Sequence, residues 1–138
     1  MLENVSDEVV AAFGRLLPQL SRSAKPVTHA DLEALRDSPA VTVLLARCDD
    51  TIAGTLTLVM FPLPTGLRSW VEDVVTDEAF RGRGIGEALT RAAIRLAQEA
   101  GARTLDLTSR PSREAAGRLY ERTGFELRES RVYRYTYE

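Results

Sequence analysis

The sequence has little of what several classes of protein and site require. It holds one cysteine, Cys48, so no disulfide can form within the chain. It holds one histidine, His29, and one lysine, Lys25, and no cluster of metal-ligating residues is visible. No run approaches the roughly 18 apolar residues of a membrane span, and no basic segment precedes an apolar core near Met1. We expect a cytoplasmic protein without a metal ion or a membrane contact.

The composition is that of a globular protein. Apolar residues make up 44% of the 138 positions and charged residues 28%. A chain of this length buries about two thirds of its unfolded surface, so we expect one domain over residues 1–138. The net charge of −2 gives no general attraction to nucleic acid, and any recognition of phosphate must be local.

Hydrophobic spacing and turn residues predict an alternation of helices and strands. We expect Pro18 to end the first helix and Gly124 to end the last one. The predicted helices are Ser6–Leu17, Thr28–Arg36, Glu87–Ala100 and Ser112–Arg122. The predicted strands are Val41–Ala46, Ile52–Phe61, Trp70–Thr76, Thr104–Thr108, Phe125–Arg128 and Val132–Tyr137. Pro62–Gly66 is predicted to be a loop. The order predicts a mixed α/β layer architecture, with a strand-helix-strand crossover and hence a parallel pair between Trp70 and Thr108.

The glycines at 82, 84 and 86 form the most informative motif, in the run Phe-Arg-Gly-Arg-Gly-Ile-Gly. Glycine lets successive backbone amides converge on one point, and a helix that follows directly adds free amides and the positive end of its dipole. Such a loop favours a diphosphate, and a tight turn is the plain alternative. Position 87 is Glu, which excludes the dinucleotide fingerprint, and the loop has no lysine for a Walker motif.

Two motifs resemble those of the GCN5-related N-acetyltransferase (GNAT) family. Arg81, Gly84 and Gly86 match its diphosphate loop, Arg or Gln, two residues, Gly, one residue, Gly or Ala. The run Glu114–Phe125 is similar to its A-x-x-L-Y-E-x-x-G-F helix. The resemblance covers the chain from about Val41 onward. It implies the GNAT acyl-CoA N-acyltransferase fold, an α/β protein with a central twisted mixed sheet and helices on both faces.

The same resemblance implies acetyl-CoA as the co-substrate and an amine as the acceptor. The loop amides would bind the diphosphate, with Arg81 shaping the loop or pairing with a phosphate. Main-chain groups of the preceding strand would pair with the pantetheine arm in a gap between two strands. The amide of Val74 would donate to the thioester oxygen. The expected cofactor-binding residues are Val74, Val75, Thr76, Arg81, Gly82, Arg83, Gly84, Ile85, Gly86 and Arg113.

Two residues are candidates for the proton movements. Tyr120 matches the family tyrosine thought to protonate the departing sulfur, and packing of its ring is the alternative. Glu72 stands where several family members carry a base. It is expected to act on the amine directly or through a water, to bind the ammonium, or to pair with an arginine. Strand alternation predicts that Glu72, Val74 and Thr76 share one side of the strand.

Three positions carry weaker expectations. Arg113 replaces an Asn that contacts the pantetheine in many relatives, and an arginine there reaches toward a phosphate. His29 is expected to be an exposed residue near a helix cap without a catalytic role. Cys48 is expected to be a small buried apolar side chain, because no neighbouring residue in the sequence supplies a base.

Three functions compete at this point. The first is an active N-acetyltransferase that works by direct attack on a small-molecule or peptide amine. The second is a non-catalytic CoA-binding module with a regulatory or interaction role. The third, a nucleic-acid binder, rests on the arginines near Arg110, and an exposed charged helix face accounts for them better because Glu114 and Glu121 balance them. The Val132–Tyr137 strand is a candidate for pairing across a homodimer.

Overall fold

The computed structural model describes residues 1–109 and 113–137 and divides the chain into two compact units, Met1–Thr108 and Ser109–Glu138. The first unit contains the helices α1 (Asp7–Leu20), α2 (His29–Asp37) and α3 (Ile85–Glu99). Its strands are β1 (Val41–Cys48), β2 (Thr51–Leu63), β3 (Gly66–Thr76) and β4 (Thr104–Asp106). A short 3₁₀ helix, η1 (Glu78–Phe80), follows β3.

The residues at which the first two helices are predicted to begin, Ser6 and Thr28, are the N-caps of α1 and α2, which begin one residue later. The Ser6 hydroxyl accepts from the Val9 amide, and Thr28 and Asp31 form a reciprocal capping box. The prediction that Pro18 ends α1 is wrong, because the helix continues to Leu20. Since the apolar face of α1 is packed in the core, tertiary burial holds the last turn in spite of the proline.

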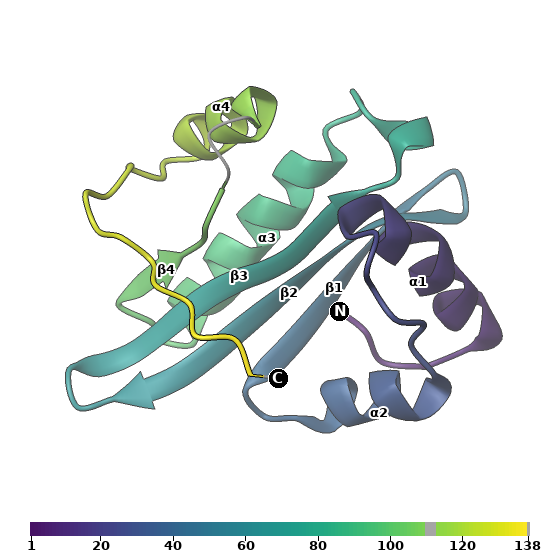
Figure 1. Ribbon diagram of the computed structural model, residues 1–138, viewed down its shortest axis with the longest axis horizontal. Coiled ribbons are helices and arrows are strands. Elements are labelled where there is room, and N and C mark those ends of the chain that lie inside the picture. The colour runs from purple at the N-terminus through teal and green to yellow at the C-terminus, as the bar shows by residue number, and fades with distance from the viewer. Residues whose placement is uncertain (110–112, 138) are drawn as a thin grey trace. The chain divides into compact units, whose positions relative to one another are not determined.

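Four strands form one mixed sheet in the order β1-β2-β3-β4 (Figure 1). β1, β2 and β3 are antiparallel neighbours, and β4 runs parallel to β3, which confirms the predicted crossover. Asp49 and Asp50 join β1 to β2 with φ angles of 52° and 65°, the positive values of a two-residue hairpin turn. The predicted loop at Pro62–Gly66 is shorter than expected, because β2 reaches Leu63 and β3 begins at Gly66.

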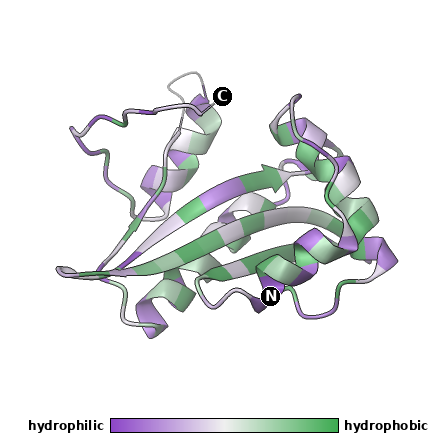
Figure 2. Cartoon of the chain, turned by 60° about the horizontal axis from the view of Figure 1, so that its bottom comes forward, coloured by the Kyte–Doolittle hydropathy of each residue, from purple (hydrophilic) through white to green (hydrophobic). Residues whose placement is uncertain are grey.

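The sheet of the first unit is covered on both faces. One core cluster joins α1 and α2 to the sheet through Leu16, Leu32 and Val43, and another joins α3 to the opposite face through Leu44, Leu56 and Leu89. Figure 2 shows the strands as mostly apolar, while the helices carry both apolar and polar residues. This is the arrangement that the predicted fold class requires.

Gly54 on β2 lets the first turn of α3 approach the sheet closely. A Cβ atom at this position would lie 2.9 Å from Cγ2 of Ile85 and 3.1 Å from the carbonyl oxygen of Val75. Because Ile85 is branched at Cβ and Val75 contributes backbone, neither group moves aside easily. Gly54 therefore sets how closely the start of α3 sits against the end of β3.

We expect Gly54→Ala to lower the free energy of unfolding by about 1–3 kcal/mol through overpacking. Chemical denaturation would measure the change. The matched control is Gly14→Ala on α1, where a Cβ would meet nothing within 4 Å, so the alanine should raise stability through helix propensity. Equal stability of the Gly54→Ala variant and the wild type would contradict this close packing.

The second unit contains one helix in its described residues, α4 (Glu114–Arg122). The predicted start at Ser112 lies outside the described residues, and Gly124 follows the helix end with a φ of 105°. The strands predicted at Phe125–Arg128 and Val132–Tyr137 are wrong, because residues 125–137 form no regular secondary structure. Residues with a high strand propensity form a strand where they pack on a paired and half-buried surface. Here the large apolar side chains are exposed, namely those of Leu127, Val132, Tyr133, Tyr135 and Tyr137.

Candidate active site

The glycine loop joins η1 to α3 through two residues with left-handed backbone. Gly82 has a φ of 83° and Gly84, the N-cap of α3, has a φ of 77°. A Cβ atom at either position would meet nothing within 4 Å, so this side of the loop is open. Gly84 offers no side-chain cap, and the first-turn amides of α3, such as those of Ile85 and Gly86, have no side-chain acceptor from the N-cap. Free amides at a helix N-terminus are the kind of donor that anions prefer in proteins.

The two loop arginines differ in their surroundings. The guanidinium of Arg83 lies 3.0 Å from the Asp49 carboxylate, 3.5 Å from Sγ of Cys48 and 5.2 Å from the centre of the Phe80 ring. The hydrogen bonds to Cys48 and Asp49 raise the pKa of Arg83, so it stays charged. Arg81 is exposed and makes no ion pair among the described residues. Arg83 therefore ties the loop to the β1–β2 turn, while Arg81 is available for an anion.

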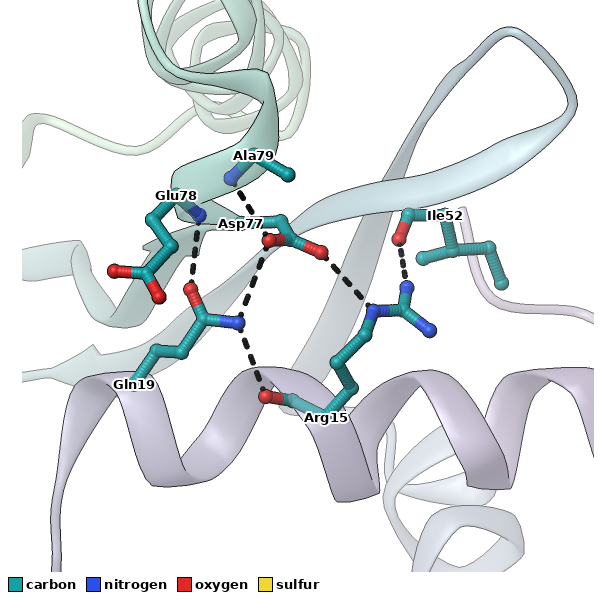
Figure 3. Close-up of polar contacts among 6 residues, drawn as sticks. All are labelled: Arg15, Gln19, Ile52, Asp77, Glu78 and Ala79. Carbon is teal, nitrogen blue, oxygen red and sulfur yellow. Dashed lines mark hydrogen bonds and ion pairs between the residues drawn. The ribbon is translucent and has the colours of Figure 1, made fainter.

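The segment leading into the loop is held by a buried carboxylate (Figure 3). Asp77 is 5% exposed, and it accepts from the Ala79 amide at 3.1 Å and from Nε of Arg15 at 3.0 Å. The hydrogen bond from the Ala79 amide, followed by those from Arg15 and Gln19, holds the pKa of Asp77 below its ordinary value although burial opposes the shift. Asp77 is therefore ionised at neutral pH.

A β-bulge in β3 changes which face Glu72 occupies. Glu72 pairs with Thr57 and Val75 with Thr55, so two residues of β3 stand opposite the single residue between those threonines. The bulge residue Asp73 has a φ of 49°, a left-handed backbone that Asp tolerates better than most residues.

The prediction that Glu72, Val74 and Thr76 lie on one side of the strand is therefore wrong for Glu72. Val74 packs in the cluster of the α3 face, whereas Val75 packs in the cluster of the α1 and α2 face. Because Thr55 and Thr57 share one face, their partners Val75 and Glu72 share it too. Glu72 is exposed on the sheet face that α1 and α2 cover.

The pairing of β3 with β4 ends well before β3 does. The parallel ladder covers Arg68–Trp70, and β3 continues through the bulge to Thr76. Within residues 1–108, the β3 edge from Val71 to Thr76 has no strand partner on the β4 side. Backbone groups at such an edge are suited to pairing with an extended amide chain.

Tyr120 and Arg113 belong to the second unit. Tyr120 lies in the last turn of α4, and Gly124 turns the chain so that the Phe125 amide donates to the Tyr120 carbonyl oxygen at 3.0 Å. The two rings pack edge to face with their centres 5.7 Å apart. Burial raises the pKa of the Tyr120 phenol, and the positive charge of Arg113 opposes this shift. The phenol is thus protonated at neutral pH.

The remaining candidates have other surroundings. His29 is exposed, and its Nε2 lies 3.0 Å from the Asp7 carboxylate at the starts of α2 and α1. Cys48 is half-buried beside Arg83. In residues 1–109 and 113–137, no group of three or more His, Cys, Asp or Glu is placed to hold a metal ion. No helix in this part of the chain is long and apolar enough to cross a membrane.

Sequence reasoning did not find the residues that hold the start of the loop. Arg15 and Gln19 come from α1, far from Asp77 in the sequence. Their spacing of one helical turn and the tendency of Asp to cap a following turn were signals in the sequence. Neither signal says which distant residue the arginine meets.

A mixed sheet covered by helices on both faces, with a bulged strand that leads into a glycine loop and a helix N-terminus, defines an acyl-CoA N-acyltransferase fold. The profile of the Acetyltransferase (GNAT) family matches residues 6–125, and the chain belongs to this family.

Individual relatives agree with the family match. N-alpha-acetyltransferase 30 of Schizosaccharomyces pombe is 37% identical over 71 residues, 51% of this chain and 47% of that protein. Probable glucosamine 6-phosphate N-acetyltransferase 2 of Oryza sativa subsp. japonica is 34% identical over 113 residues, 78% of this chain and 66% of that protein. This chain therefore spans less than two thirds of either relative. A solved structure described as an acetyltransferase from Agrobacterium tumefaciens str. C58 is 26% identical with a TM-score of 0.87, covering 99% of this chain and 98% of that one.

Proposed function

We propose that this protein is an N-acetyltransferase that moves the acetyl group of acetyl-CoA to a primary amine by direct attack in a ternary complex. One observation carries the proposal: the open edge of bulged β3 runs through η1 into a glycine loop and an uncapped helix N-terminus. An extended amide arm and a diphosphate need these two features in this order. The family match over residues 6–125 supports one acetyltransferase domain that includes residues of both units.

The loop binds the diphosphate mainly through backbone. Amides that converge near the left-handed Gly82 and Gly84, together with the positive end of α3, stabilise negative charge. Arg81, which is exposed, adds a charged donor. The cofactor-binding residues of the loop are Arg81, Gly82, Arg83, Gly84, Ile85 and Gly86, and Arg113 is a further candidate for a phosphate contact.

The β3 edge binds the pantetheine arm and the thioester. Main-chain groups of Val74, Val75 and Thr76 lie on the part of β3 that continues beyond the β4 ladder. They pair with the amides of the arm as a strand would. The Val74 amide donates to the thioester oxygen, where negative charge grows as the amine attacks the carbonyl carbon.

The reaction moves protons at three points: the acceptor ammonium loses one before attack, the attacking nitrogen loses a second as it becomes an amide, and the departing sulfur gains one. The nitrogen of the neutral amine forms the new C–N bond, the C–S bond breaks, and the second nitrogen proton passes to solvent water, from which the Tyr120 phenolate is protonated again. Glu72, directly or through a water, takes the proton that the ammonium must lose, and the face it shares with α1 and α2 is the one on which we place the acceptor. Tyr120, protonated at neutral pH, gives its proton to the departing sulfur.

We expect Glu72→Gln to lower kcat/KM for the amine about a hundredfold at neutral pH, because general base catalysis contributes at least this much. The dissociation constant of CoA should stay within about twofold. Asp73→Asn is the matched control, since it removes one exposed negative charge next door and Asn tolerates the left-handed backbone. Full activity of Glu72→Gln would show that Glu72 is not the base.

A panel of amines tests the function and the acceptor together. Two relatives carry names that mention glucosamine 6-phosphate and N-alpha acetylation, so the panel begins with that amino sugar and with a peptide that has a free N-terminus. Release of the CoA thiol reports turnover. CoA binding without turnover on any amine would favour a CoA-binding regulatory module, and absence of CoA binding would overturn the proposal.

A further inference from the structure

Two residues one turn apart on α1 hold the segment that leads into the glycine loop. Arg15 donates from Nε to the Asp77 carboxylate at 3.0 Å and from its terminal nitrogen to the Ile52 carbonyl oxygen at 2.5 Å. Its guanidinium thus joins β2 to the residue that directly follows β3 (Figure 3). A charged fork with two acceptors fixes direction as well as distance.

Gln19 makes the second connection. Its carbonyl oxygen accepts from the Glu78 amide at 2.9 Å, and its Nε2 donates to the Arg15 carbonyl oxygen at 3.1 Å and lies 3.5 Å from the Asp77 carboxylate. Asp77 itself accepts from the next amide, that of Ala79. The first two amides of η1 are therefore held by side chains of α1 and by Asp77.

The helix that makes these contacts is firmly anchored. α1 packs Val9, Ala12, Phe13 and Leu16 into the core. Asp77 is 5% exposed, and its amide donates to the Ala53 carbonyl oxygen at 2.7 Å. Arg81 follows Asp77 by four residues, and η1 fills the three positions between them, so these contacts fix the chain directly before the loop.

We propose that Arg15, Gln19 and Asp77, here called the α1 clamp, are positioning residues that hold the glycine loop in the geometry that binds a diphosphate. The inference rests on the proposed function, since it names residues that act on that site without touching the cofactor. The proposed function places the acceptor on the sheet face that α1 covers, and the inference gives α1 a second role, in cofactor binding. If the inference is correct, variants that lack the α1 clamp bind molecules that contain a diphosphate more weakly than the wild type does.

A purely structural role of these contacts predicts something different. Loss of α1 docking would weaken the whole sheet face, including the β3 edge that we assign to pantetheine. The chain offers a matched contact for comparison: Glu8 on α1 pairs with Arg47 on β1 at 2.6 Å, a contact that includes neither Asp77 nor a residue of η1. Arg47→Met removes an ion pair between α1 and the sheet and leaves the clamp intact.

The test uses the full chain with Arg15→Met, Asp77→Asn, the double variant and Arg47→Met. Calorimetric titration with CoA should show an increase in dissociation constant of about tenfold for each single clamp variant. The double variant should show about the same increase, because each single substitution already breaks the shared Arg15–Asp77 ion pair. Binding of pantetheine, which has no diphosphate, should change less than about twofold by NMR titration. Arg47→Met should bind both probes as the wild type does.

Two results of the binding experiments would overturn the inference. One is CoA binding within twofold of the wild type in both single clamp variants, and the other is an equal loss of CoA and pantetheine binding. Amide hydrogen exchange of residues 78–86 in the free protein is the second measurement: it should be faster in the clamp variants than in Arg47→Met, and equal rates would also overturn the inference. If the wild type binds no CoA, the proposed function fails while the exchange data still decide whether the clamp holds the loop.

Discussion

Replacement of Gly84 by valine is expected to weaken CoA binding about a hundredfold while the protein remains folded. Gly84 holds a φ of 77° and a ψ of 15°, and a β-branched residue in this left-handed region costs roughly 1–3 kcal/mol. The loop would relax to another backbone geometry, so binding would have to restore the strained one. At about 1.4 kcal/mol per factor of ten, this strain and the added bulk on the open side account for the expected loss. Calorimetric titration with CoA measures it.

Gly14→Val is the matched control for this prediction. Gly14 lies within α1, and a Cβ there would meet nothing within 4 Å, just as at Gly84. Valine and glycine differ by only a few tenths of a kcal/mol in a helix interior, so CoA binding and stability should hardly change. If Gly84→Val binds CoA as tightly as Gly14→Val does, the loop amides do not hold the diphosphate in the observed geometry.

Tyr120→Phe is expected to lower kcat about a hundredfold with no change in CoA affinity. The substitution removes the phenolic proton and keeps the ring that packs on Phe125 at 5.7 Å, so α4 should keep its end. General acid assistance contributes about 10²–10⁴-fold in enzymes, and we expect the lower end because a phenol is a weaker acid than a thiol. Tyr133→Phe, at a ring that is 87% exposed, is the control and should leave kcat unchanged.

The pH profile gives a second check on Tyr120. Burial raises the pKa of its phenol above the ordinary value of 10.0, so the proton-donating form persists as the pH rises through neutrality to at least pH 10. Between about pH 7 and pH 9.5, the kcat of the wild type should therefore change with pH in the same way as the kcat of Tyr120→Phe. An alkaline limb in this range that disappears in the variant would mean that the phenol titrates lower and has another role.

Local chemistry explains why much of the fold could be predicted. The capping box at Thr28 and Asp31, the hairpin turn at Asp49 and Asp50, and the glycine loop depend on residues that are neighbours in the sequence. Their backbone preferences are intrinsic, so the sequence predicts them directly. The parallel pairing of β3 with β4 follows from the helix between them, because such a connection needs a crossover.

The sequence by itself thus determined the helices and strands of the first unit and the place of the glycine loop before α3. Only the tertiary structure decided the features that depend on distant partners. The bulge at Asp73 exists only in the register with β2, and it moves Glu72 to the other face from Val74. The ion pair of Arg15 with Asp77 joins residues 62 positions apart. Contacts of this kind arise from how layers pack, a choice that no local preference encodes.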